Sequence, residues 1–221
     1  MSKGAQTDVI IMDFSKAFDR VPHKRLLHKL SHYGIRGYTL EWIAAFLNDR
    51  RQSVVVAGEA SGLLDVDSGV PQGSVLGPIL FLLYINDLPA STVSPMRLFA
   101  DDCILYREIK TPEDSQLLQS DLDRVADWER DWLMDLNPAK CSVLRVTRCR
   151  VPHAYQYTSH NIPLKVEDST KYLGLTLTSK LNWTPPPASI TSAVRQTEPW
   201  DLLEDTSGKR PKRLKKMHIR P

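Results

Sequence analysis

The chain has 221 residues, of which 42% are hydrophobic and 25% charged, as is ordinary for a globular protein with one large domain or two small ones. Its three cysteines form no CxxC pair, which argues against a zinc knuckle or a disulfide framework and favours a reducing, intracellular setting. The N-terminus, MSKGAQTD, has no apolar signal core, and the longest apolar run, ILFLLYI at 79–85, is too short to cross a bilayer. We therefore expect an intracellular protein without a membrane segment.

The net charge of +3 is unevenly distributed along the chain. Residues 208–221 carry seven of the 29 Lys and Arg and no acid, which leaves 22 basic against 26 acidic residues in the rest. We favour a solvated, disordered tail, and a nuclear address or a phosphate-binding arm is the alternative. The stretch before it has proline breaks and little apolar periodicity, so a disordered extension is expected over 184–221.

The first half of the chain alternates between strand and helix patterns. An apolar run at 9–12 predicts a buried strand that ends at Asp13. Helical spacing follows at 23–33, where Gly34 supplies a stop, and again at 38–49. Residues 51–57 and 63–67 are typical of a strand pair, and a Gly/Pro-punctuated loop then enters an apolar helix.

The second half completes a sheet. Two strand-like arms at 95–108 surround Asp101 and Asp102, a helix runs from Thr111 to about Asp135, and strands are expected at 141–147 and 171–178. Strands and helices in this order predict an α+β fold, a split β-α-β antiparallel sheet with helices packed on one face.

The acidic residues suggest chemistry. Asp13 ends one strand, and Asp101 and Asp102 lie at the turn of a hairpin. If the strands are neighbours, three carboxylates converge, which is costly unless a cation such as Mg²⁺ neutralises them. Two ions roughly 3.5–4 Å apart would form a clamp for phosphoryl transfer. A pair of aspartates in a turn is more often simply solvated, so this pattern alone does not decide.

Five blocks of sequence, taken together, are far more specific. They are DFSKAFDRVPHKRLLHKL at 13–30, GVPQGSVLGPILFLLYINDLP at 69–89, FADD at 99–102, LNPAKCSVL at 136–144 and KYLGLTLTSKLNW at 171–183. In this order they closely resemble motifs of the reverse transcriptases of non-LTR (LINE-type) retrotransposons. The resemblance covers roughly residues 8–183. It implies that 1–183 form the palm of a right-hand polymerase, an RNA-directed DNA polymerase.

The resemblance also implies a catalytic centre. Asp13, Asp101 and Asp102 match the metal-binding aspartates, which in this family hold two Mg²⁺ ions, with Mn²⁺ as a substitute. Phe18 matches a bulky gate that excludes a 2′-OH and so favours dNTPs; a plain core position is the alternative. Lys140 matches a lysine near the departing pyrophosphate, although a lone lysine at a strand start is usually a surface residue.

Two further segments are implied to contact the RNA template, the DNA primer and the incoming dNTP. Gly69, Pro71, Gln72 and Gly73 match the loop under the template and new base pair, where Gln72 would hydrogen-bond near the nucleotide; the alternative is an ordinary turn. Tyr172, Leu173 and Gly174 match the hairpin that grips the primer end, and its apolar residues equally suit a sheet core.

The sequence also departs from the family pattern. Only about a dozen residues precede Asp13, where family members carry a fingers region, and the likeness stops after Trp183, where they continue into a thumb. We therefore expect a truncated chain. A catalytically silent remnant or a domesticated nucleic-acid-binding module remains open, and a two-metal nuclease ranks behind both because it needs neither PQGS nor Phe18. The oligomeric state does not follow from the sequence.

Overall fold

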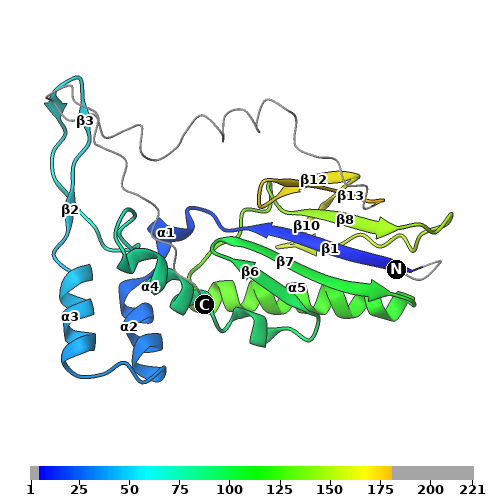
Figure 1. Cartoon of the computed structure of the whole chain (residues 1–221), viewed down its shortest axis with the longest axis horizontal. Helices are drawn as coiled ribbons and strands as arrows, with labels where there is room; N and C mark the ends of the chain where they lie inside the picture. The colour runs from blue at the N-terminus through cyan, green and yellow to red at the C-terminus, as the bar shows by residue number, and fades with distance from the viewer. Residues whose placement is uncertain (1–4, 181–221) are drawn as a thin grey trace, which may run out of the picture. The chain divides into compact units, whose positions relative to one another are not determined.

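The structure, a computed structural model, describes residues 5–180 and contains a five-stranded sheet in this part of the chain (Figure 1). The strand order is β11 (Lys165–Glu167), β8 (Ser142–Thr147), β1 (Gln6–Asp13), β7 (Asp102–Ile109) and β6 (Met96–Phe99). All neighbours are antiparallel except β11 and β8, which are parallel. The α+β class is confirmed. The extension expected over 184–221 and its basic tail lie outside the described residues.

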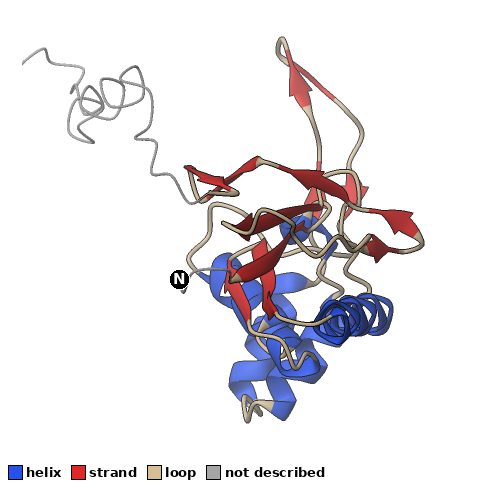
Figure 2. Cartoon of the chain, turned by 90° about the vertical axis from the view of Figure 1, so that its right-hand side faces the viewer, coloured by secondary structure: helices blue, strands red, loops and turns tan. Residues whose placement is uncertain are grey.

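Most of the helices gather on one side of the strands (Figure 2). They are α1 (Ala17–Arg20), α2 (His23–His32), α3 (Tyr38–Leu47), α4 (Leu76–Ile85) and α5 (Pro112–Trp132), with a 3₁₀ turn at Leu88–Ser91. The spacing of Leu118, Leu122 and Val125 places them on one face of α5, where they are buried against the sheet. The helices α2 and α3 begin and end within two residues of the expected bounds, and α5 ends about three residues before its expected end. The apolar helix expected without bounds is α4, and the short helix α1 was not expected.

Alternate residues of β1 face opposite sides of the sheet, which explains its continuous apolar run. Ile10 and Met12 join the core beneath the helices. Ile11 packs on the other side with Leu144 and with Leu177 of the hairpin β12 (Ser169–Tyr172) and β13 (Leu175–Thr178). Both faces of the central strand are therefore covered.

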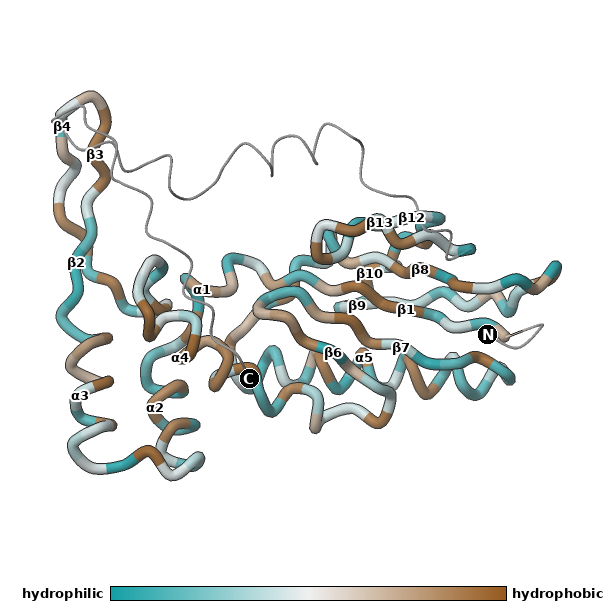
Figure 3. The backbone as a smooth tube through the Cα atoms, viewed as in Figure 1, coloured by the Kyte–Doolittle hydropathy of each residue, from teal (hydrophilic) through white to brown (hydrophobic). Residues whose placement is uncertain are grey.

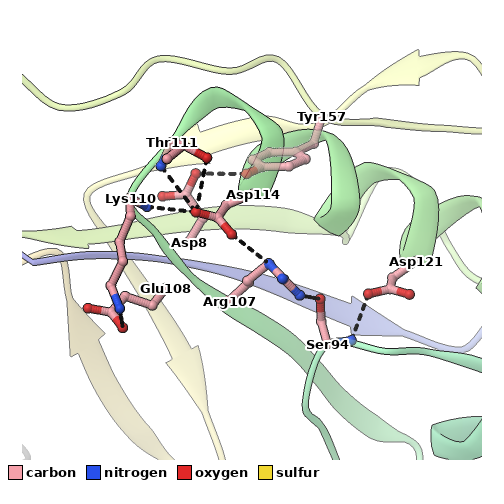
Figure 4. Close-up of polar contacts among 9 residues, drawn as sticks. All are labelled: Asp8, Ser94, Arg107, Glu108, Lys110, Thr111, Asp114, Asp121 and Tyr157. Carbon is pink, nitrogen blue, oxygen red and sulfur yellow. Dashed lines mark hydrogen bonds and ion pairs between the residues drawn. The ribbon is translucent and has the colours of Figure 1, made fainter.

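Polar contacts attach the start of α5 to the sheet (Figure 4). The Asp114 carboxylate accepts hydrogen bonds from the backbone N–H of Thr111 at 3.1 Å and from the Arg107 guanidinium at 3.3 Å. Arg107 also donates to the Ser94 hydroxyl at 3.2 Å. Asp121, which lies about two turns after Asp114 in α5, accepts a hydrogen bond from the backbone N–H of Ser94 at 2.7 Å. These bonds hold the loop before β6 against the helix.

A buried carboxylate sits at the opposite end of β1 from Asp13. Asp8 is fully buried and accepts hydrogen bonds from the Tyr157 hydroxyl (Figure 4) and from the Gln6 amide, both at 2.9 Å. The Arg145 guanidinium lies 3.4 Å away. A buried charge needs such partners, so we assign this cluster a structural role.

Two expected elements differ in detail. The strand pair at 51–67 is a ribbon of two short ladders, β2 (Arg51–Gln52) with β5 (Leu64–Asp65) and β3 (Val55–Val56) with β4 (Glu59–Ala60). Its valines are exposed, and hydrophobic colour runs along β3 (Figure 3). The single strand expected at 171–178 is wrong, because Leu173 and Gly174 have positive φ angles and turn the chain into a hairpin. A small hairpin of β9 (Thr158–Ser159) and β10 (Ile162–Pro163) was not expected.

Candidate active site

The three aspartates meet where β1 ends and β7 begins. Asp13 and Asp102 are paired residues of the β1–β7 ladder, and Asp101 precedes Asp102 in the β6–β7 turn. Ala100 takes a positive φ of 51° in this turn, a conformation that is uncommon for a residue with a side chain. Residues separated by nearly 90 positions in the chain are thus brought side by side by the register of the sheet.

The carboxylates at this junction affect one another. Burial raises the pKa of Asp102, and the charges of Asp101 and then Asp13 raise it further. The countercharge comes from Lys140, whose Nζ lies 2.9 Å from Asp13 Oδ2. That hydrogen bond and the charge of Asp13 raise the pKa of Lys140. The junction is therefore an acidic cluster that one exposed lysine partly neutralises.

The segment between α5 and β8 brings Lys140 to the site. It runs antiparallel to the residues around Asp13: Ser15 N–H donates to the Asp135 carbonyl at 2.8 Å, and Asn137 N–H donates to the Asp13 carbonyl at 2.8 Å. A β-bridge between Phe14 and Leu136 lies between these two bonds. The backbone of Asp13 is consequently held on both sides, by β7 and by this segment.

Glu129, which the sequence reasoning missed, supports the same segment. Only 2% of Glu129 is exposed, and its Oε2 accepts the Leu136 backbone N–H at 2.9 Å and lies 3.0 Å from His160 Nε2. Its Oε1 is buried and has no hydrogen-bond partner. Burial raises the pKa of Glu129. The available signal was an acid four residues after Val125, on the apolar stripe of α5.

The position of Phe18 is compatible with both alternatives from the sequence, a gate beneath the incoming sugar and a core position. Its ring stacks on Phe81 of α4, with centroids 4.4 Å apart and an interplanar angle of 23°. The residue is only partly buried, at the edge of the core. The stacking fixes the ring from one side, so a role in packing and a role at the surface are compatible.

The loop before α4 lies directly against the chain that follows Asp13. Gly69 N–H donates to the Val21 carbonyl at 2.8 Å, and Val70 N–H donates to the Phe18 carbonyl at 2.7 Å. At Gly69, with a φ of +92°, a Cβ would lie 2.8 Å from the Asp19 carbonyl oxygen. This close approach of two backbones requires glycine.

The remaining residues of this loop are placed by local bonds. Gln72 Nε2 donates to Asp19 Oδ1 at 3.1 Å. The Pro71 carbonyl accepts the Ser74 hydroxyl at 2.7 Å, and Gly73 turns the chain with a φ of +79°. The loop thus enters α4 in a defined conformation.

A pocket of about 550 Å³ lies beside this loop, apart from the three aspartates. Its walls are the loop itself, the strands of the ribbon and the turn before α1, and its lining residues are Lys16, Asp19, 50–52 and 65–72. Acidic and basic side chains are both present, so the pocket is polar without a strong charge of either sign.

The β12–β13 hairpin packs on the face of the sheet opposite the helices, near the acidic cluster. Burial raises the pKa of Tyr172, and the negative charge of Asp102 raises it further, as expected when the two groups are close. Leu173 and Gly174 form the turn that follows. The structure therefore brings Tyr172 toward Asp102, while Gln72 and the pocket belong to the neighbouring loop.

A divalent cation is suited to the chemistry of this cluster. Within residues 5–180, no three His, Cys, Asp or Glu side chains are grouped closely enough to hold a metal, and Asp13 is paired with Lys140 instead. The backbone register nevertheless presents hard carboxylate oxygens from adjacent strands, and the raised pKa of Asp102 marks negative charge without a full countercharge. Carboxylate oxygens of this kind suit a hard cation such as Mg²⁺ better than a softer metal.

Comparison with known proteins decides the family. The family model described as "Reverse transcriptase (RNA-dependent DNA polymerase)" matches residues 2–177. The chain belongs to the reverse transcriptase family. Its similar relatives are non-LTR retrotransposon polymerases, as the resemblance of the five blocks predicted.

This reverse transcriptase chain is 31% identical over 192 residues to the probable RNA-directed DNA polymerase from transposon X-element of Drosophila melanogaster, covering 84% of this chain and 21% of that protein. It is 29% identical over 194 residues to the polymerase from mobile element jockey of the same species, covering 83% and 21%. A type-1 R2 Pol polyprotein of Popillia japonica is also 29% identical, over 89% of this chain and 35% of the relative. The chain thus spans about a fifth to a third of these relatives.

A solved structure of apo telomerase from Candida tropicalis shares the fold, with a TM-score of 0.57 and 12% identity, over 82% of this chain and 36% of that one. Telomerase from Candida albicans in complex with a telomeric RNA fragment gives 0.56 and 14%, over 82% and 30%. No helix within the described residues is long and apolar enough to cross a membrane.

Proposed function

We propose that this reverse transcriptase domain is the palm of a template-directed DNA polymerase that transfers nucleotides from dNTPs to a primer 3′-OH on an RNA template. Its sheet would be the split β-α-β sheet of a right-hand polymerase. The observation that carries the proposal is the pairing of Asp13 with Asp102 in adjacent strands, with Asp101 next to them and Lys140 at the Asp13 carboxylate.

In this proposal Asp13, Asp101 and Asp102 are metal ligands rather than general bases. Two Mg²⁺ ions, or Mn²⁺, would lower the pKa of the primer hydroxyl and stabilise charge on the triphosphate. The hydrogen bond to Asp13 and the charge of Asp13 raise the pKa of Lys140 and keep it protonated beside the carboxylates. It would therefore place a cation, and a proton donor, near the departing pyrophosphate.

The other residues would position the substrates. Phe18, fixed by Phe81, would lie under the sugar and exclude a 2′-OH. Gln72 and Gly73 would contact the incoming nucleotide, while Gly69 and Pro71 support the template base. Tyr172, Leu173 and Gly174 would hold the primer end; the proximity of Tyr172 to Asp102 supports this role.

A second candidate is a nucleic-acid-binding module without catalysis. It is favoured by the ion pair of Asp13 with Lys140, which gives the Asp13 carboxylate a cationic partner from the protein itself. A metal-dependent nuclease is the third candidate, since clustered acids also serve hydrolysis.

Primer extension separates these candidates. The purified chain is given an RNA template, a DNA primer, dNTPs and Mg²⁺ or Mn²⁺, beside the double variant Asp101→Asn, Asp102→Asn, which keeps the side-chain shape. Extension that the variant lacks supports the polymerase. Binding without extension in a folded chain supports the module, and cleavage without dNTPs supports the nuclease.

A further inference from the structure

One face of α3 carries aromatic side chains at every fourth residue, and an arginine follows shortly after the end of the helix. Tyr38 is 90% exposed and Trp42 is 58% exposed. The Trp42 and Phe46 rings are stacked, with centroids 6.2 Å apart and an interplanar angle of 22°. The Arg50 guanidinium lies 5.6 Å from the centre of Phe46. Tyr38, Trp42 and Phe46 are four residues apart and share one face of the helix. Arg50 lies beyond the end of α3 at Leu47 and continues this row through its contact with Phe46. We call these four side chains the α3 ladder.

Within the ladder, Tyr38 and Trp42 are exposed, whereas Phe46 is partly buried against the main core. Ile43 and Leu47 are buried in the main core, and α3 contacts α2. The exposed residues between the ladder positions include Thr39, Glu41 and Asn48. The rings therefore stand on a largely polar surface, whereas the core of a protein–protein interface is a continuous, charge-depleted apolar patch.

The guanidinium at the end of the ladder makes no ion pair within the described residues, although aspartates line the same pocket. Arg50 makes no ion pair and no side-chain hydrogen bond with any residue between 5 and 180, whereas its neighbour Arg51 is paired with Asp65 at 3.0 Å. A guanidinium that stacks on an aromatic ring and keeps its donors free is suited to a phosphate oxygen.

Arg50 also connects the ladder with the pocket beside the loop. It lines that pocket together with Lys16 and residues 69–72. A nucleic-acid strand that passed from this pocket along α3 would therefore meet Arg50 first, and then Phe46, Trp42 and Tyr38. Four residues of helix advance about 6 Å, so successive rings are presented in regular order along the path.

We propose that the α3 ladder is a stacking platform for the unpaired, single-stranded part of the nucleic acid that the loop at 69–73 holds. Arg50 binds a backbone phosphate and the rings of Trp42 and Tyr38 stack on bases. Every base has a flat face, so such binding tolerates any sequence. This inference rests on the proposed function, because it assigns the template to that loop.

The test measures the affinity of the full chain for a fluorescein-labelled single-stranded RNA of about 15 nucleotides by anisotropy. Trp42→Leu keeps apolar area but removes the ring and lowers affinity about tenfold, whereas Trp42→Phe keeps a ring and stays within about threefold of wild type. Arg50→Gln lowers affinity and flattens its dependence on salt. RNA also quenches tryptophan emission in the wild type, and this quenching is reduced in Trp42→Phe.

The controls are an exposed apolar residue and an exposed arginine of α5, substituted as Leu117→Ala and Arg130→Gln, which leave the affinity unchanged. All substituted side chains are solvent-exposed, and circular dichroism verifies that each variant is folded. Equal affinity of Trp42→Leu and wild type overturns the inference. So does a change in sedimentation of Trp42→Leu with unaltered RNA affinity, which would make the ladder a surface for protein contact.

Primer extension with the same preparations separates this inference from the proposed function. If RNA binding depends on Trp42 but the chain extends no primer, the stacking role of the α3 ladder is supported and the polymerase function is rejected. If the chain extends a primer but its RNA binding does not depend on Trp42, the polymerase function is supported and the stacking role of the α3 ladder is rejected.

Discussion

Lys140 Nζ lies 2.9 Å from Asp13 Oδ2, although 126 residues separate the two in the chain. Asp13 thereby has a cation beside it in the absence of metal, and Lys140 is held, protonated, at the cluster where phosphoryl chemistry is proposed. The pair joins the two motifs that lie furthest apart among those with proposed catalytic roles.

Lys140→Ala should leave stability unchanged, because exposed ion pairs contribute little. It should lower the rate of single-nucleotide incorporation about a hundredfold, since a proton donor at the leaving group is lost. Rapid-quench single-turnover kinetics and thermal unfolding make the two measurements. Lys140→Arg keeps the charge but is a poor acid, so its incorporation rate should lie between those of wild type and Lys140→Ala. A rate equal to wild type in Lys140→Ala would rule out this role.

Mg²⁺ should raise the unfolding temperature of the wild type. At a hundred times its dissociation constant a ligand stabilises by about 2.7 kcal/mol, equivalent to roughly 5–10 °C for a domain of this size. Asp102→Asn should abolish that shift. In EDTA the same variant should be slightly more stable than wild type, because it removes a charge that burial and its acidic neighbours disfavour. Equal Mg²⁺ shifts in both proteins would place the metal elsewhere.

Gly69 and Gly73 form a matched pair for testing the loop. Gly69→Ala combines a positive φ with a Cβ 2.8 Å from the Asp19 carbonyl oxygen, and should cost about 3 kcal/mol. Gly73→Ala has the same kind of φ but open space, and should cost about 1–2 kcal/mol. Urea unfolding measures both. Equal losses would contradict the close approach of the loop to Asp19.

Glu129 gives a prediction that depends on pH. Its pKa is raised in the folded chain, so folding favours its protonated form. Its contribution to the free energy of unfolding therefore falls as pH rises from the unfolded pKa, about 4.3, through the folded pKa. Glu129→Gln keeps an acceptor for Leu136 N–H and removes the charge, so it should be more stable than wild type at pH 7 and gain nothing at pH 4.

The control for this prediction is Glu129→Leu, which leaves the Leu136 N–H without an acceptor. It should lose about 1–3 kcal/mol relative to Glu129→Gln at either pH. Amide hydrogen exchange at Leu136 and Asn137 should also speed up in the leucine variant. If the leucine and glutamine variants unfold alike, the Glu129–Leu136 contact does not hold this segment.

The sequence alone determined the family, the α+β class, the bounds of α2 and α3 and the start of α5. Apolar period, helix stops such as Gly34 and the Thr111–Asp114 helix start act within a few residues, so they can be recognised without tertiary contacts. The five ordered blocks likewise mark Asp13, Asp101 and Asp102 as a set. The hairpin at 169–178 was foreseen by the family resemblance and missed by periodicity, because its turn lies in two residues with positive φ.

The tertiary structure decided how these parts meet. Strand register places Asp13 opposite Asp102, the Glu129 carboxylate binds the segment that carries Lys140, and the Phe81 ring supports Phe18. Each relationship joins residues far apart in the chain, and its geometry depends on side-chain direction and backbone pairing across the core. Local composition contains no record of such contacts, so the same periodicities are compatible with many arrangements until the elements pack.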